Sequence, residues 1–371
     1  MLVPITNTPR DYAWGSTTAI AELLGTTPSG GPEAELWLGA HPGSPARIAD
    51  GSGTLLDVVD GRLPFLLKVL AAASPLSLQA HPTPAQAEAG FAAEERAGVA
   101  IDDPTRNYKD AFHKPELIYA LSASFRALCG FRSTAETRTV LGSAVGDAAI
   151  ADLFARLDDD AQLRPVFEWL ITRGEGVDAL IAAVVAASAA ESATGLSWDT
   201  VRLLAGAYPG DPGIVISLLL HTVELHRGEV LYLPAGNIHA YLDGLGIELM
   251  AASDNVLRGG LTPKHVDVPE LLTVLDFRPL PVPYLASESP RPGVRVFRPD
   301  VPDFVLTVLD DAALAEGVDL ELDGRPAIAL WAQGSGTVGD AAVAHGGAVY
   351  LAEEPVATMR GSGLVFVASA G

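Results

Sequence analysis

The chain has 371 residues, which at roughly 150 residues per domain predicts two or three domains. Its 24 lysines and arginines against 46 aspartates and glutamates give a net charge of −22, which argues against a protein that binds nucleic acid or an anionic membrane surface. An anionic small substrate is not excluded, because a few clustered cations can dominate one pocket. Since 49% of the residues are hydrophobic, the chain can bury a large core and is not a disordered acidic protein.

Features of the cellular compartment are few but agree. The single cysteine, Cys129, cannot form an intrachain disulfide, which suits a reducing compartment. The start of the sequence, MLVPITNTPRDYAWGS, lacks the basic and apolar regions of a secretory signal. The most apolar window, residues 180–190, is too short to span a bilayer. We therefore expect a soluble cytoplasmic protein without a membrane partner.

Residues 1–130 read as a β-rich region. Short apolar runs bounded by Gly, Pro and Ser predict strands, and they lie at 35–38, 64–70, 76–79 and 116–121. An Ala/Glu-rich stretch, residues 84–98, predicts a helix.

In residues 131–210 the spacing of the apolar residues changes to that of helices. Apolar side chains recur at i, i+3, i+4 and i+7, which predicts amphipathic helices over residues 163–171, 177–185 and 201–208. The sequence Pro-Gly-Asp-Pro-Gly at 209–213 ends this region. We interpret it as a helical insertion into the β-rich region.

Strand-like runs return after residue 213, at 214–220, 229–233 and 246–250. A Pro-rich link, residues 278–294, precedes a last set of strand-like segments from 296 to 370, which predicts a small self-contained β-sandwich or barrel. The fold class expected is mainly β, a jelly-roll barrel with an inserted α-helical domain and a second C-terminal β jelly roll. The domains predicted are 1–130 plus 211–285 (catalytic), 131–210 (helical) and 286–371 (C-terminal).

Four polar residues stand out as possible metal ligands. Gln79 and His81 are two apart, so on a strand they face the same side. Glu116 opens an apolar run after Pro115, and proline is tolerated at the start of a strand. His239 ends the pattern G-x5-P-x-G-x2-H at 228–239, which is the second motif of the cupin family, with Asp243 where that motif usually has Asn. Together the four offer N and O ligands that suit a catalytic Zn²⁺, one per chain.

Longer stretches resemble one family, the type I mannose-6-phosphate isomerases. The resemblance covers most of residues 10–132 and 210–277, and its segments are YAWGS (12–16), ELWLGAHP (35–42), PLSLQAHP (75–82), NYKDAFHKPE (107–116), ALCGFR (127–132), PAGNIHAYLDG (234–244) and GIELMAASDNVLRGGLTPKHVD (246–267). It implies that Gln79, His81, Glu116 and His239 hold zinc and that Arg258 is catalytic. It further implies that the pocket is lined by Lys68, Ser77, Lys114, Tyr241 and Glu248.

The implied reaction interconverts D-mannose 6-phosphate and D-fructose 6-phosphate by moving a proton between C1 and C2 through a cis-enediol or enediolate. Such a reaction needs stabilisation of a developing oxyanion, which a divalent metal and Arg258 could supply. The candidates for binding the phosphate are Lys68, Ser77, Lys114 and Arg258. A general base is also needed, and Glu248, His113 and Lys114 remain open candidates.

Two other functions remain open at this point. His81, His239 and Glu116 could form the iron(II) site of a cupin oxygenase. The chain could also be a non-catalytic cupin that binds sugar phosphates. The expected partner in the leading interpretation is a small phosphorylated sugar, with no nucleic acid and no membrane, and the chain is expected to be a monomer.

Overall fold

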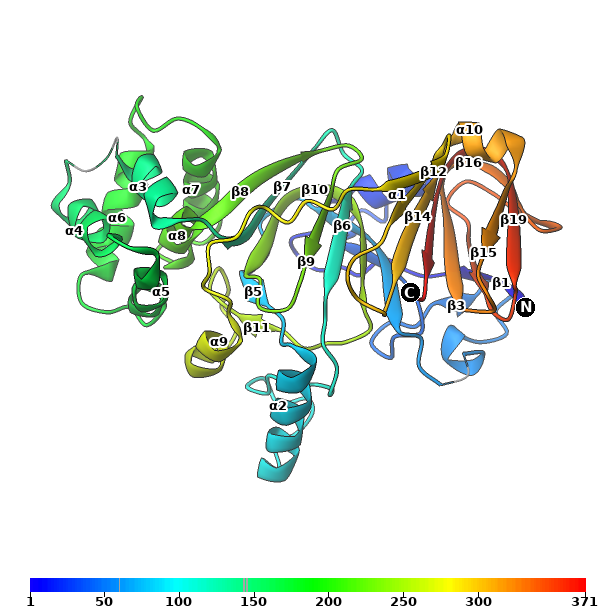
Figure 1. Cartoon of the computed structure of the whole chain (residues 1–371), viewed down its shortest axis with the longest axis horizontal. Coiled ribbons are helices and arrows are strands. Elements are labelled where there is room, and N and C mark those ends of the chain that lie inside the picture. Colours follow the sequence, from blue (N-terminus) through cyan, green and yellow to red (C-terminus); the bar gives the residue numbers. More distant parts are fainter. Residues whose placement is uncertain (60, 143, 145) are drawn as a thin grey trace.

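The computed structural model describes residues 1–371 except 60, 143 and 145. Three parts follow one another along its long axis (Figure 1): a helical part, a central β part, and a second β part where both chain ends lie. The predicted fold class, mainly β with a helical insertion and a second β part, is confirmed.

The central β part is organised around one long strand, β10 (His239–Ala251). The first half of β10 pairs with β5 and β7, and its second half pairs with β4 and β6. β10 thus passes from one antiparallel sheet into another, as strands do at the corners of a jelly roll. The other strands of this part are β2 (Glu35–Leu38), β4 (Phe65–Ala72), β5 (Gln79–Ala80), β6 (Glu116–Ala120), β7 (Ser124–Phe131), β8 (Leu220–His226), β9 (Val230–Leu233) and β11 (Leu257–Arg258).

Strands β4 and β6 are buried at every position, which explains why their sequences are continuous apolar runs instead of alternating ones. One face of each strand contributes to the core inside the barrel, as Leu70 and Ile118 do. The other face, which includes Val69 and Leu117, packs in a second cluster together with the C-terminal strands. Both faces therefore exclude water.

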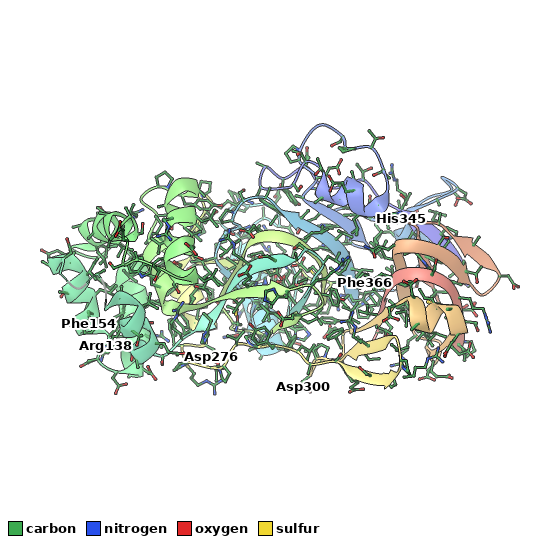
Figure 2. All side chains as sticks on the ribbon, turned by 90° about the horizontal axis from the view of Figure 1, so that it is seen from above. Arg138, Phe154, Asp276, Asp300, His345 and Phe366 are labelled. Carbon is green, nitrogen blue, oxygen red and sulfur yellow. The ribbon has the colours of Figure 1, made fainter. Side chains whose placement is uncertain are left out.

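The second β part is not self-contained. Strand β1 pairs with β18 and with β3, so residues 2–6 and 47–48 join this sheet although the sequence assigns them to the catalytic domain. Its core is shared with the central part through Phe304 and Phe366, and Figure 2 shows Phe366 where the two meet. The predicted domain boundaries stay a prediction. Strands β1 and β3 lie on the N-terminal side of these boundaries in the sequence but in the C-terminal sheet of the structure. The strands of this sheet are β1 (Leu2–Thr6), β3 (Arg47–Ile48), β12 (Glu288–Arg291), β13 (Val294–Phe297), β14 (Val305–Leu309), β15 (Val318–Glu321), β16 (Ala327–Val338), β17 (Ala341–Val343), β18 (Ala348–Leu351) and β19 (Val356–Ser369).

The helical part packs its apolar faces against the β7 side of the barrel in a common cluster that includes Phe131 and Phe167. Arg138 lies over the Phe154 ring, 3.8 Å from its centroid (Figure 2). The helices are α3 (Thr134–Leu141), α4 (Ala148–Arg156), α5 (Leu163–Ile171), α6 (Val177–Ser188), α7 (Leu196–Ala207) and α8 (Gly213–Ile216). The three periodic segments predicted as helices thus lie within α5, α6 and α7 or end one residue beyond them.

The strand predicted at residues 214–220 is wrong. This segment forms α8 and the 3-10 helix η3 (Ser217–Leu219), and strand β8 begins only at Leu220. Every residue of the segment is buried, so it has no polar face that would reveal its period. A short, uniformly apolar run does not distinguish a buried strand from a buried helix.

The remaining helices are short apart from α2, which projects from the barrel (Figure 1). The Thr83 side chain accepts a hydrogen bond from Gln86 N–H at the start of α2, and Gly98 ends the helix at φ 71°. None of the described helices has the length and apolar character needed to cross a membrane. The elements are α1 (Ala19–Leu24), α2 (Pro84–Ala97), α9 (Val268–Val274), α10 (Asp311–Glu316), η1 (Leu55–Asp57) and η2 (Asp160–Gln162).

Candidate metal centre

Three predicted ligands meet inside the barrel. His81, Glu116 and His239 are buried, and one ligand atom from each lies within 4.8 Å of the others. Glu116 Oε1 lies 3.2 Å from His81 Nε2, and Glu116 Oε2 lies 3.2 Å from His239 Nε2. Residues more than 100 positions apart in the sequence thus converge on one centre.

Gln79 completes the set. Its Nε2 lies 3.3 Å from His239 Nε2, and a half-turn of the amide exchanges this nitrogen for Oε1, the atom that would bind a metal. His81 Nε2 and Glu116 Oε2 are fully buried and have no hydrogen-bond partner in the described part of the chain. Buried polar atoms are normally satisfied. Two unsatisfied atoms that face the same point therefore fit a divalent cation.

The second nitrogen of each imidazole is held by the backbone. His81 Nδ1 lies 2.7 Å from the carbonyl oxygen of Asn255, and His239 Nδ1 lies 2.9 Å from that of Asn237. A carbonyl can only accept, so each Nδ1 carries the proton, and Nε2 is the atom of each ring that would bind a metal at the centre. This second layer of contacts is typical of metal-binding histidines.

The charge states also suit a cation. Burial lowers the pKa of His81 to about 4, so the imidazole is neutral at pH 7. Burial alone would raise the pKa of the Glu116 carboxyl, but the Lys114 ammonium and the neighbouring imidazoles hold it well below its usual range. The centre therefore presents the neutral imidazole of His81 and the carboxylate of Glu116.

The strand register explains how these side chains come together. Gln79 on β5 lies opposite His239 on β10 and opposite Arg258 on β11. Directly paired residues in antiparallel strands point to the same face, so one row carries Arg258, Gln79 and His239. The register shifts between Tyr241 and Asp243. Such an irregularity changes which residues face inward.

The centre opens into a cavity of about 580 Å³. Its lining includes most of the side chains that the sequence assigned to the pocket: Lys68, Ser77, Lys114, Tyr241, Glu248 and Arg258. Lys114 Nζ lies 3.0 Å from Glu116 Oε1. The Tyr241 hydroxyl is fully buried and has no hydrogen-bond partner among the described residues. The cavity thus offers donors as well as a metal centre.

Lys68 faces anions, but they belong to the protein. Its Nζ lies 2.8 Å from Glu248 Oε2 and 3.6 Å from Glu35 Oε1, and its ammonium lies 5.0 Å from the centroid of Trp37. Burial would lower the Lys68 pKa, but these carboxylates raise it, so the lysine stays charged. This placement does not support the prediction that Lys68 binds phosphate, because its charge already balances two buried carboxylates.

Glu248 is a buried acid in the cavity lining whose carboxyl has a raised pKa. Burial raises the pKa of its carboxyl, and the charges of Glu116 and Glu35 add to that effect against the opposing charge of Lys68. A carboxyl whose pKa is raised can hold or release a proton closer to neutral pH. Glu35 accepts a hydrogen bond from Trp37 Nε1 at 2.9 Å, which fixes the far side of this charge cluster.

His113 does not join the cavity. Its Nε2 lies 2.8 Å from Asp303 Oδ2, on the loop before β14 of the second β part. Lys114 and Glu116 both line the cavity and contact each other, whereas His113 is absent from its lining and lies in the loop before β6. Its predicted role as a base is therefore not supported by its position.

Sequence reasoning missed three residues around the cavity. Lys264 lines it beside Arg258, and no carboxylate in the described part of the chain pairs with either cation. Burial, and for Lys264 also the charge of Arg258, lowers the pKa of both groups. Glu35 is buried in the charge cluster around Lys68, and Asn255 is buried beside His81. Lys264 and Glu35 lie in segments that the family resemblance covers, which was the available signal.

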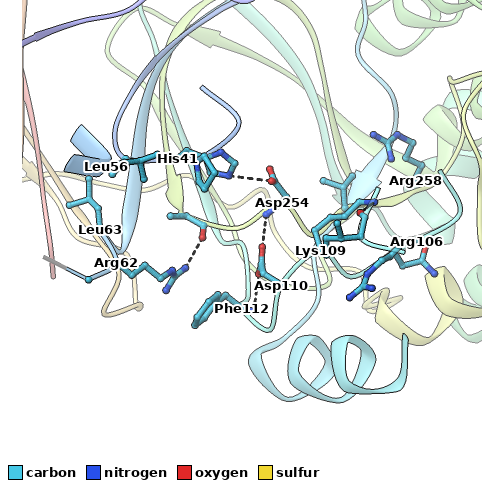
Figure 3. A pocket seen from close by; sticks show the side chains of 17 residues that line it. His41, Leu56, Arg62, Leu63, Arg106, Lys109, Asp110, Phe112, Asp254 and Arg258 are labelled. Carbon is cyan, nitrogen blue, oxygen red and sulfur yellow. Dashed lines mark hydrogen bonds and ion pairs between the residues drawn. The ribbon is translucent and has the colours of Figure 1, made fainter. Parts of the chain in front are cut away.

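A second cavity of about 680 Å³ adjoins the first. The two share Asp254, Val256 and Arg258 in their linings. Figure 3 shows this second cavity, with His41 Nε2 3.3 Å from Asp254 Oδ2 and Asp110 accepting a hydrogen bond from the backbone N–H of Asp254. The segment that carries Arg258 therefore forms the wall between the two cavities.

Comparison with known proteins agrees with this geometry. Residues 2–134 match the family model for the catalytic domain of type I phosphomannose isomerase. The chain is 40% identical over 324 residues to mannose-6-phosphate isomerase of Escherichia coli, covering 82% of each chain, and 32% identical over 383 residues to that of Homo sapiens, covering 90% of this chain and 87% of the human one. A solved zinc-bound mannose-6-phosphate isomerase superposes with a TM-score of 0.89 at 35% identity, covering 100% of this chain and 99% of the other.

Proposed function

This chain belongs to the type I phosphomannose isomerase family, and on that premise we propose how its residues interconvert D-mannose 6-phosphate and D-fructose 6-phosphate with zinc. The observation that carries the proposal is the buried cluster of His81, Glu116 and His239, whose unsatisfied ligand atoms face one point beside Gln79. Zn²⁺ bound by these four residues would polarise the substrate carbonyl and hydroxyl oxygens.

The unpaired cations at one side of the cavity support the binding of the substrate's anionic groups. Arg258 lies in the strand row beside Gln79, next to the metal centre, and we assign it to the oxyanion that develops at C1 and C2. Lys264 lies farther along the same segment, lines the cavity and is exposed, and we assign it to the phosphate. Ser77 lines the same cavity and is a candidate hydroxyl donor. The Lys68 ammonium contacts Glu248 and Glu35, so we rank it after Lys264 as a group for the phosphate.

Among the candidates for proton transfer, Glu248 has the strongest support. It lines the cavity, and burial raises the pKa of its carboxyl. Lys68 Nζ donates to its Oε2 and so orients the carboxyl. Lys114 contacts Glu116, and we assign it to holding that ligand ionised. The buried Tyr241 hydroxyl would donate to a substrate oxygen.

The two alternative functions are not favoured. The relatives are isomerases and a similar solved structure holds zinc, and both findings argue against an iron(II) oxygenase. A non-catalytic binding protein would not need the complete set of ligands and cavity cations, which this chain keeps.

Three predictions go beyond the comparisons. We propose that the protein is a monomer, that it acts in the cytoplasm, and that its domains are residues 1–130 with 211–285, 131–210 and 286–371, with residues 2–6 and 47–48 adding strands to the sheet of the last one. Light scattering of the purified chain would test the first, because a dimer would double the measured mass.

A metal-reconstitution assay tests the function. The protein is stripped with a chelator, reloaded with Zn²⁺ or Fe²⁺, and assayed for fructose 6-phosphate formed from mannose 6-phosphate. We expect activity to return with Zn²⁺, and His239→Ala to lose both metal and turnover because the remaining ligands do not close the site. Oxygen consumption with Fe²⁺ and no isomerisation would favour the oxygenase.

A further inference from the structure

Asn255 contacts both His81, a candidate metal ligand, and residues 109–112, the segment that leads to the ligand Glu116. It is fully buried, and its carbonyl oxygen is the acceptor that holds His81 Nδ1 at 2.7 Å. It also lies three residues before Arg258. The position of its backbone therefore sets the orientation of one ligand.

The side chain of Asn255 is bonded on both sides. Its Oδ1 accepts a hydrogen bond from Lys109 N–H at 2.7 Å, and its Nδ2 donates to the carbonyl oxygens of Asp110 and Phe112, each at 2.8 Å. All of these partners belong to residues 109–112, the segment directly before Lys114 and Glu116. The Asn255 amide thus forms hydrogen bonds, both as donor and as acceptor, with the backbone of one segment.

Neighbouring contacts strengthen the same junction. Ser253 Oγ lies 2.8 Å from Asp110 Oδ1 and accepts from Asn255 N–H at 3.2 Å. Asp110 Oδ2 accepts from the backbone N–H of Asp254 at 2.9 Å, a contact drawn in Figure 3. Side chains of both segments, 109–112 and 253–255, therefore form hydrogen bonds to the other segment.

We propose that Asn255 is a positioning residue that joins the carbonyl acceptor of His81 to the segment leading into Glu116, and that this junction slows the release of the bound metal. The inference rests on the proposed function, since it takes His81 and Glu116 as zinc ligands. While the hydrogen bonds of the Asn255 side chain hold the two segments together, they restrict movement of the His81 acceptor relative to the segment that leads to Glu116. Partners that orient metal ligands typically contribute 10–100-fold to affinity or activity.

The two histidines differ in this respect. The acceptor of His239 Nδ1 is the carbonyl of Asn237, two residues away on the same turn. The acceptor of His81 is 174 positions away in the sequence. Tertiary contacts must hold that acceptor in place. The pairing of β11 with β5 brings residues 257–258 beside residues 79–80, and the Asn255 amide fixes the segment before β11 to residues 109–112.

The test is the rate at which zinc leaves the loaded protein. Asn255→Ala removes the amide and keeps the backbone carbonyl. Transfer of zinc to a chromogenic chelator is followed at a temperature well below unfolding, and we expect the rate to rise roughly tenfold or more. Asn107→Ala is the matched control, because it removes one amide hydrogen bond of 2.8 Å, to Asp267, from the neighbouring position of the same loop. Its release rate should stay within about twofold of wild type.

A second variant keeps the test decisive if Asn255→Ala does not fold. Ser253→Ala removes only the hydroxyl contacts at the same junction and should raise the release rate severalfold. The proposal is overturned if the variants that fold, Asn255→Ala or Ser253→Ala, release zinc no faster than Asn107→Ala does. The proposed function has a separate failure: if wild type retains no zinc, or if His81→Ala releases it no faster than wild type, the ligand assignment is wrong and not merely the role of Asn255.

Discussion

His81 is neutral in the fold at a pH where an exposed histidine would be protonated. Its pKa is lowered to about 4 by burial, against about 6.5 for a histidine in an unfolded chain. Between these values the unfolded chain binds a proton that the native chain does not, so stability falls as the pH falls. The nitrogen is thereby kept free for a metal at neutral pH.

A pH series on metal-free protein would detect this proton. We expect the free energy of unfolding to decrease as the pH falls from about 6.5 to about 4, by up to about 1.4 kcal/mol per pH unit from this group. His81→Gln should have a shallower dependence over that window, measured by urea unfolding with chelator present. Parallel curves for the two proteins would show that His81 is not the group responsible.

Arg258 can be separated from the metal ligands by substitution. Arg258→Ala should retain zinc, because the guanidinium does not contact the ligand cluster, but should lose roughly 10²–10³-fold in kcat through lost oxyanion stabilisation. Zinc content and turnover are measured on the same sample. Arg278→Ala is the control, since Arg278 is exposed and pairs with Asp276. Near-normal turnover of Arg258→Ala would remove the arginine from the proposed mechanism.

At the scale of elements, β10 is the strand on which the site depends. It pairs with β4, β5, β6 and β7 and carries His239, Tyr241 and Glu248. Gly246 allows β6 to lie close, because a Cβ added there would be 2.7 Å from Ile118 Cδ1 and 2.9 Å from the carbonyl oxygen of Tyr119. Strand β6 begins at Glu116, so its distance from β10 sets the position of a ligand.

Gly246→Val should therefore affect both stability and metal retention. We expect a loss of about 1–3 kcal/mol from overpacking, together with weaker zinc binding, measured by chemical unfolding and chelator competition. Gly206→Ala in α7 is the contrasting variant, because no atom lies within 4 Å of its added Cβ. That substitution should stabilise the protein by about 0.5–1 kcal/mol. Unchanged zinc affinity in a folded Gly246→Val protein would contradict the coupling of β10 and β6.

At the scale of the whole molecule, the shared cores predict joint unfolding. One cluster spans the barrel and the second β part, and another spans the barrel and the helices. Scanning calorimetry should show a single transition for all three parts. Phe366→Ala, in the shared cluster, should destabilise the protein by about 3–5 kcal/mol and shift that transition as a whole. Two separated transitions, with zinc lost in only one, would mean that the parts are independent.

The site was more predictable than the contacts around it. Gln79, His81, Glu116 and His239 stand in motifs long enough to be identified from sequence, and the structure brings them together. The sequence predicts an anion beside Lys68, because a lysine in an apolar run needs one, but it did not reveal that Glu248 lies opposite it on β10. His113 lies in the loop before β6, where strand alternation gives no signal, and only the tertiary structure shows its contact with Asp303.

Local pattern and motif length determined the family, the mainly β architecture, the helical insertion and the set of candidate metal ligands. Only the tertiary structure decided that 214–220 is helical, that the first strand joins the C-terminal sheet, and which carboxylates neutralise Lys68. The reason is physical: periodicity records which side of an element a residue faces, whereas burial, pairing and charge balance depend on what another segment brings to that side.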